Sequence, residues 1–164
     1  MSQLQDVWRF TRVRLDASLA GLSNEQLNWR PYPGGHTIAE NVYHTVGAEH
    51  YWCWRISGRD PSATAFDREL EAAVGPAYDH GISIASQGAK ENTMEGLREA
   101  MDYVYALADE VMGSADEAKM QTMMISPLGD NLSQYNGLVR MSQHAGYHAG
   151  QIWQIRLHPD FPKS

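Results

Sequence analysis

The chain has 164 residues, of which 43% are hydrophobic, and this length and composition predict a single domain with a substantial apolar core. Its 13 Lys and Arg against 20 Asp and Glu give a net charge of -7 at pH 7, so nucleic acid and membrane surfaces are not expected partners. The sequence shows neither a signal-like start nor an apolar run of transmembrane length. We therefore expect one cytoplasmic domain that spans residues 1–164.

The single cysteine, Cys53, rules out an intramolecular disulfide and a metal site built from several cysteines. It lies between Trp52 and Trp54 in an apolar stretch, which favours a packed thiol over a reactive one.

Apolar residues at three- and four-residue steps predict a first helix over residues 3–22. Its apolar stripe consists of Leu4, Val7, Trp8, Thr11, Leu15, Leu19 and Leu22. The polar run at 23–26 ends this helix, and the Pro- and Gly-containing segment 29–35 predicts a structured loop. A second helix should begin at Thr37, because Thr37 and Glu40 have the spacing of a capping box, and it should continue to about Ile56.

The connection up to about Lys90 has no sustained period, and we expect in it only a short helix near residues 67–74. A third helix is predicted to start near Asn92 and to end at residues 113–114, and the segment up to Ser133 is expected to be loop. A fourth helix covers about Gln134 to Leu157. The sequence thus predicts an all-α fold, a four-helix bundle with a long crossover between the second and third helices.

Three histidines are candidate metal ligands. His144 and His148 are four residues apart, so on a helix their imidazoles project from one face and can reach the same ion. His44 lies on the second predicted helix and could meet them inside a bundle. Three nitrogens would leave an open position that activates water or substrate. From the residues alone, satisfied core or surface histidines remain an equal alternative.

Two motifs carry a resemblance to a known family. The first reads PYPGGHTIAENVYH over residues 31–44, the second reads HAGYHAGQI over residues 144–152, and GLSNEQLNWRP over 21–31 precedes them. In this order they resemble the DinB-like (YfiT-like) superfamily of metal-dependent enzymes, which is unrelated to the DNA polymerase of the same label. Many members read HHRGQ at the last ligand, whereas this chain reads YHAGQ over 147–151, so any role of the extra histidine or arginine is absent here.

The resemblance implies that His44, His144 and His148 hold a divalent ion, with zinc or nickel as the expected metals, and that the protein forms a homodimer. It also implies a function, because characterised members include transferases and isomerases that use low-molecular-weight thiols. We therefore expect transfer or addition of a small thiol cosubstrate to an electrophilic small-molecule substrate. The alternatives are a metal-dependent hydrolase and a non-catalytic bundle in which the ion only joins helices.

Catalytic residues are less well defined by the sequence. Glu40 lies one turn before His44 and could orient an imidazole or act as a base, although its capping position also explains it. Gln151 lies one turn after His148 and could line the same cavity. His36 is a candidate for orienting a ligand, whereas His50 is expected at the surface or an interface, and His80 and His158 in loops.

Overall fold

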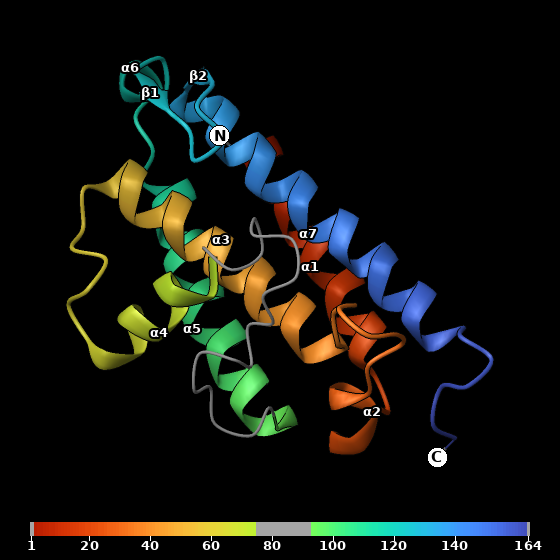
Figure 1. Cartoon of the computed structure of the whole chain (residues 1–164). Coiled ribbons are helices and arrows are strands. Elements are labelled where there is room, and N and C mark those ends of the chain that lie inside the picture. The colour runs from red at the N-terminus through yellow and green to blue at the C-terminus, as the bar shows by residue number, and fades with distance from the viewer. Residues whose placement is uncertain (1, 75–92, 164) are drawn as a thin grey trace.

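The structure is a computed structural model that describes residues 2–74 and 93–163. Four long helices form most of it: α1 (Ser2–Leu19), α3 (Ile38–Ser57), α5 (Met94–Gly113) and α7 (Gln134–Arg156). Helix α7 packs against α1 and α3, and α5 packs against α3 and α1, so the four helices surround a shared core (Figure 1). The predicted all-α class is confirmed.

The boundaries of the long helices follow from their caps. At the start of α3, the Thr37 hydroxyl accepts a hydrogen bond from the Glu40 amide while the Glu40 carboxylate accepts one from the Thr37 amide, which confirms the predicted capping box. Gly58 ends α3 with a φ of 75°, a left-handed conformation that glycine adopts without a steric penalty. Helix α5 is capped by Thr93, one residue later than the predicted start near Asn92.

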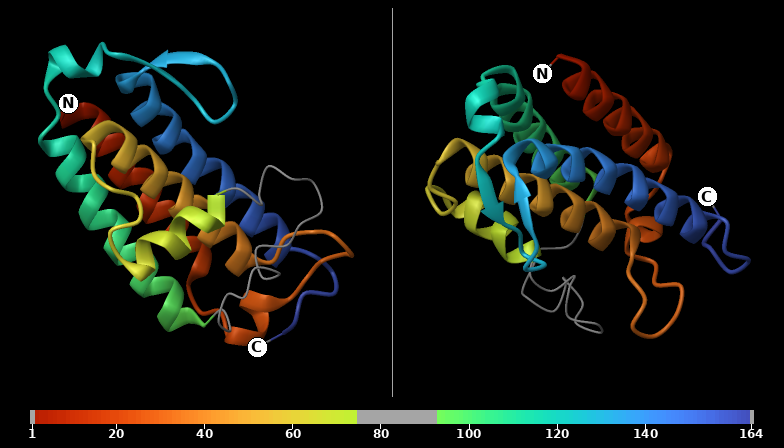
Figure 2. Two further views of the ribbon diagram at one scale, coloured as in Figure 1. Left: turned by 60° about the vertical axis from the view of Figure 1, so that its left-hand side comes forward. Right: turned by 90° about the horizontal axis from the view of Figure 1, so that it is seen from above.

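Further short elements lie between the long helices. A capping box between Ser23 and Gln26 supports α2 (Asn24–Asn28) at the end of the bundle near the C-terminus (Figure 1). Near the other end, α6 (Glu117–Met120) precedes an antiparallel hairpin of β1 (Met123–Ile125) and β2 (Asn131–Ser133), visible beside the start of α7 in Figure 2. The expectation of loop from the end of α5 to Ser133 was therefore wrong at α6, β1 and β2, whereas residues 29–35 contain no helix or strand, as predicted.

The core confirms most of the apolar stripes, with one exception on α1. Leu15 and Leu19 are fully buried, and Trp8 joins a second buried cluster with Trp52 and Cys53. Val7 was predicted in the same stripe but is 54% exposed. Its position, one residue before Trp8, turns it about 100° away from the buried face of the helix.

Helix α4 (Ala65–Val74) is the short helix that was predicted in the long connection, and the connection after it lies outside the described residues. A polar cluster joins α4 to α3 and α5. His50 and Asp67 are buried, with His50 Nε2 2.9 Å from Asp67 Oδ1, and the more exposed Tyr103 donates its hydroxyl hydrogen to the same oxygen at 2.6 Å. Burial alone would raise the pKa of Asp67, but hydrogen bonds from Tyr103, Thr64 and His50 lower it to about 2.

The expected position of His50 at the surface or an interface was wrong, because its side chain is only 2% exposed in the single chain. A buried imidazole needs a polar partner, and Asp67 supplies one from a helix that the sequence could not place against α3. Among the described helices, none combines the length and apolar character that crossing a lipid bilayer requires.

Candidate metal centre

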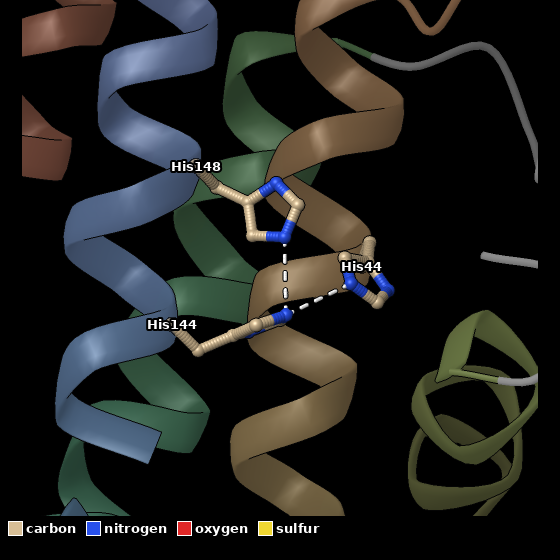
Figure 3. Close-up of side chains that lie close together, drawn as sticks. All are labelled: His44, His144 and His148. Atoms are coloured by element: carbon tan, nitrogen blue, oxygen red, sulfur yellow. Dashed lines mark hydrogen bonds between the residues drawn. The ribbon is translucent and has the colours of Figure 1, made fainter. Parts of the chain in front are cut away.

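The three predicted histidines meet between α3 and α7. His144 Nε2 lies 3.0 Å from His44 Nε2 and 3.0 Å from His148 Nε2. Figure 3 shows His144 and His148 projecting from successive turns of α7 toward His44 on α3. One nitrogen from each ring lies within 4.8 Å of the other two, and His44 and His148 are buried while His144 is partly exposed.

The local structure explains this convergence. The four-residue spacing of His144 and His148 places both rings on one side of α7. The intervening Ala145 and the later Ile152 are fully buried, so the apolar face of α7 holds that side against the core. Helix α3 lies alongside α7 and presents His44 from the facing surface.

All three imidazoles are held in the neutral form. Burial, with contributions from His144 and His36, lowers the pKa of His44 to about 3. Burial and the Arg12 guanidinium lower the pKa of His144 to about 4, and burial and the other two imidazoles lower that of His148 to about 2. Neutral imidazole is the form that binds metal ions, so no proton must leave before an ion binds near neutral pH.

These lowered pKa values predict that the metal-free protein loses stability in acid. In the unfolded chain the three rings would take up protons near pH 6.5, whereas in the folded chain they resist protonation down to about pH 4. The unfolded state therefore binds more protons in this window, and the free energy of unfolding should fall as pH is lowered from about 6.5.

Urea unfolding of the chelator-treated protein at about pH 7.5 and about pH 5 measures this loss. A His44→Phe variant should lose less stability between the two conditions, because it has one neutral ring fewer to protonate. A His158→Ala variant should behave as wild type, since His158 lies in the loop after α7. If the free energy of unfolding falls equally between the two pH values in the wild-type and His44→Phe proteins, the lowered pKa of His44 is not the cause of the loss.

The hydrogen-bonding capacity of the triad fits a metal ion better than an internal hydrogen-bond network. An imidazole nitrogen carries either one hydrogen or one lone pair, so His144 Nε2 cannot make a full hydrogen bond to both neighbours at once. A cation between the rings would be contacted by all three lone pairs. With zinc–nitrogen bonds of 2.0–2.1 Å, tetrahedral ligands would lie about 3.3–3.4 Å apart. The two separations from His144 Nε2, 3.0 Å each, are close to this value, and all three ligand atoms lie within 4.8 Å of one another.

The other candidate residues lie around the triad in different roles. Glu40 is fully buried, and its carboxylate accepts hydrogen bonds from Arg30 at 2.6 and 3.0 Å and from the Thr37 amide at 2.7 Å. These contacts account for Glu40 by helix capping and ion pairing, and its catalytic role stays a prediction. His36 Nδ1 lies 3.8 Å from the same carboxylate.

Gln151 follows His148 by one turn of α7, and its amide donates to the Tyr147 hydroxyl at 3.1 Å. A catalytic role for Gln151 also stays a prediction. His158 lies in a loop, as expected, with its ring against Trp29, and His80 lies outside the described residues.

One residue beside the triad was not among the predicted site residues. The side chain of Asn41 lies on α3, one turn before His44, and its Oδ1 atom is 3.1 Å from His148 Nδ1. An amide three residues before a predicted ligand, on the same side of a helix, is the sequence signal that could have indicated it.

The fold and the site together define a helical bundle with a buried three-histidine cluster suited to one divalent ion. The sequence profile of the DinB superfamily matches residues 8–152, and the chain belongs to this superfamily. A solved structure of a conserved protein from Enterococcus faecalis is similar in fold, with a TM-score of 0.74 and 15% identity over 96% of this chain and 95% of that chain. No sequence among the curated proteins matches this chain.

Proposed function

We propose that the protein is a metal-dependent enzyme that transfers or adds a low-molecular-weight thiol to an electrophilic small molecule. The observation that carries this proposal is the cluster of three neutral imidazoles, of which His44 and His148 are buried and His144 is partly exposed. A divalent ion at this site, with zinc or nickel as the expected metals, would act as a Lewis acid that lowers the pKa of a thiol or water.

The residues of the chain supply ligands but no sulfur nucleophile. Cys53 is fully buried in the core, and burial raises the pKa of its thiol to about 12, so it stays protonated at neutral pH. Within the described residues, the three histidines form the one cluster with metal-ligand geometry, and no cysteine or carboxylate is part of it. An external thiol would therefore have to provide the attacking sulfur.

The expected partners, a small-molecule substrate and a second copy of the chain, remain predictions. The homodimer implied by the family resemblance would need an apolar surface, and α7 exposes Tyr147 and Trp153 at 56% and 43%. Light scattering that shows only the 18.4 kDa chain at micromolar concentration would argue against a dimer.

Turnover of a thiol and a chromogenic electrophile tests the proposed function. With zinc- or nickel-loaded protein, glutathione or cysteine and chlorodinitrobenzene, a sulfur–carbon bond forms, chloride leaves and the thiol proton goes to solvent. Acceleration should persist near neutral pH, where free thiols with a pKa of about 8.5 are mostly protonated. The absorbance of the thioether product gives the rate.

Two variants separate catalysis at the metal centre from other causes. His44→Ala should reduce the rate to that of the protein-free reaction, because it removes one of three proposed ligands. Cys53→Ala should keep the wild-type rate, because its buried thiol takes no part. If the metal-loaded protein accelerates thioether formation with none of the thiols in a broad panel, the proposed S-transfer activity is wrong.

A further inference from the structure

We propose that Asn41 is a positioning residue that fixes the tautomer of His148, so that Nε2 of His148 presents a lone pair to the proposed ion. The inference rests on the proposed metal site. The side chain of Asn41 is 5% exposed and lies between α3 and α7. Its amide group contacts the Thr37 carbonyl, just before α3, and the imidazole of His148 on α7.

The orientation of the Asn41 amide follows from its second partner. Its Nδ2 atom lies 2.9 Å from the backbone carbonyl oxygen of Thr37. A carbonyl oxygen can only accept, so the NH₂ group must face Thr37 and the Oδ1 atom must face His148. With the opposite orientation two acceptors would meet at Thr37, inside the protein and away from water.

The tautomer of His148 follows from this orientation. Asn41 Oδ1 can only accept, and it lies 3.1 Å from His148 Nδ1, so Nδ1 must carry the hydrogen. In a neutral imidazole the other nitrogen then has a lone pair. That nitrogen is Nε2, the atom that lies 3.0 Å from His144 Nε2. The side of the ring that faces the triad is therefore the side able to bind an ion.

Asn41 is itself held by the loop and cap that precede His44. Its backbone amide donates to the Thr37 carbonyl at 3.1 Å, and its backbone carbonyl accepts from the Thr45 hydroxyl at 2.7 Å. The Thr37 amide donates to Glu40, which pairs with Arg30 from the loop after α2. Hydrogen bonds thus run from Arg30 through Glu40, Thr37 and Asn41 to His148. In this network the buried Glu40 helps to hold Thr37, and through Thr37 the side chain of Asn41.

Zinc affinity and tautomer state test the role of Asn41. An Asn41→Leu variant, of similar size, removes the acceptor and should weaken zinc binding about 10- to 100-fold in a chelator competition assay. An Asn41→Asp variant keeps an acceptor for His148 but loses the donor to Thr37, so its zinc affinity should stay within about threefold of wild type while its stability falls. Ser18→Ala is the matched control, because it removes a buried hydrogen bond on α1, from the Ser18 hydroxyl to the Leu15 carbonyl, that involves neither Asn41 nor the three histidines.

The combined outcome distinguishes positioning from simple support of the fold. Reduced affinity in Asn41→Leu, near-wild-type affinity in Asn41→Asp and Ser18→Ala, and lower thermal stability in all three would support the proposal. A folded Asn41→Leu protein that binds zinc as tightly as wild type would overturn it. A second measurement holds even if Asn41→Leu fails to fold: long-range ¹⁵N NMR of the metal-free wild type should show His148 protonated at Nδ1, and protonation at Nε2 would overturn the proposal.

The two proposals can fail separately. If the wild-type protein binds no divalent ion, the proposed function fails, yet the NMR measurement on metal-free protein still decides whether Asn41 sets the tautomer of His148. If zinc binds tightly but His148 is protonated at Nε2 in the metal-free protein, only the role of Asn41 is wrong.

Discussion

Replacing His148 with alanine should remove most of the zinc that the wild-type protein retains after gel filtration. The reason is geometric, because His148 Nε2 and His44 Nε2 both lie 3.0 Å from His144 Nε2, and the loss of one leaves only two nitrogens. Two protein ligands fall below the three that catalytic zinc sites normally use. Metal analysis of protein purified without a nickel column gives the content, and zinc titration gives the affinity.

His50→Ala is the matched control for this variant. Its imidazole is also buried and also lies on a long helix, but it pairs with Asp67 rather than with the triad. The variant should bind zinc as wild type does and should unfold at a lower temperature, because the carboxylate of Asp67 loses a buried partner. The metal assignment is wrong if His148→Ala and wild type hold equal amounts of zinc while the His50→Ala control behaves as described.

The convergence of His44, His144 and His148 could be predicted because it depends on short-range periodicity and on two motifs. The four-residue spacing of His144 and His148 fixes their common side on any helix, and the apolar stripes around them fix which side is buried. The capping box at Thr37 set the start of α3 and thereby the helical position of His44. These signals depend on residues close together in the chain, so they can be recognised in the sequence without knowledge of the packing.

Features that depend on contacts between distant segments could not be predicted in the same way. The strands β1 and β2 have three residues each, too short for a clear alternating pattern, and they are held by pairing with one another. The burial of His50 depends on α4, which contributes Asp67 from seventeen residues further along the chain. The contact of Asn41 with His148 depends on the packing of α7 against α3.

A buried ion pair in the core was not among the sequence predictions, although Arg12 lies on the predicted apolar stripe between Trp8 and Leu15. Arg12 on α1 and Glu49 on α3 pair directly, with side chains 4% and 0% exposed. The Trp8 indole donates to Glu49 at 3.3 Å, and Arg12 donates to the Tyr105 hydroxyl at 3.2 Å. The Arg12 guanidinium also helps to lower the pKa of His144, so this ion pair lies close enough to the triad to influence its charge.

Replacing Glu49 with glutamine should lower the free energy of unfolding by about 3–5 kcal/mol, because it leaves the Arg12 charge buried without a counter-charge. Asp109→Asn is the control: Asp109 pairs with Arg9 at 2.7 Å on the surface, where such a pair contributes at most about 1 kcal/mol. Urea unfolding of the metal-free proteins measures both losses.

Removing both charges in an Arg12→Met, Glu49→Leu double variant should recover much of the stability, since apolar side chains of similar volume can replace a buried pair. If Glu49→Gln loses no more stability than Asp109→Asn, the Arg12–Glu49 pair does not hold α1 against α3, and the apolar clusters around Trp8 and Leu15 must do so without it.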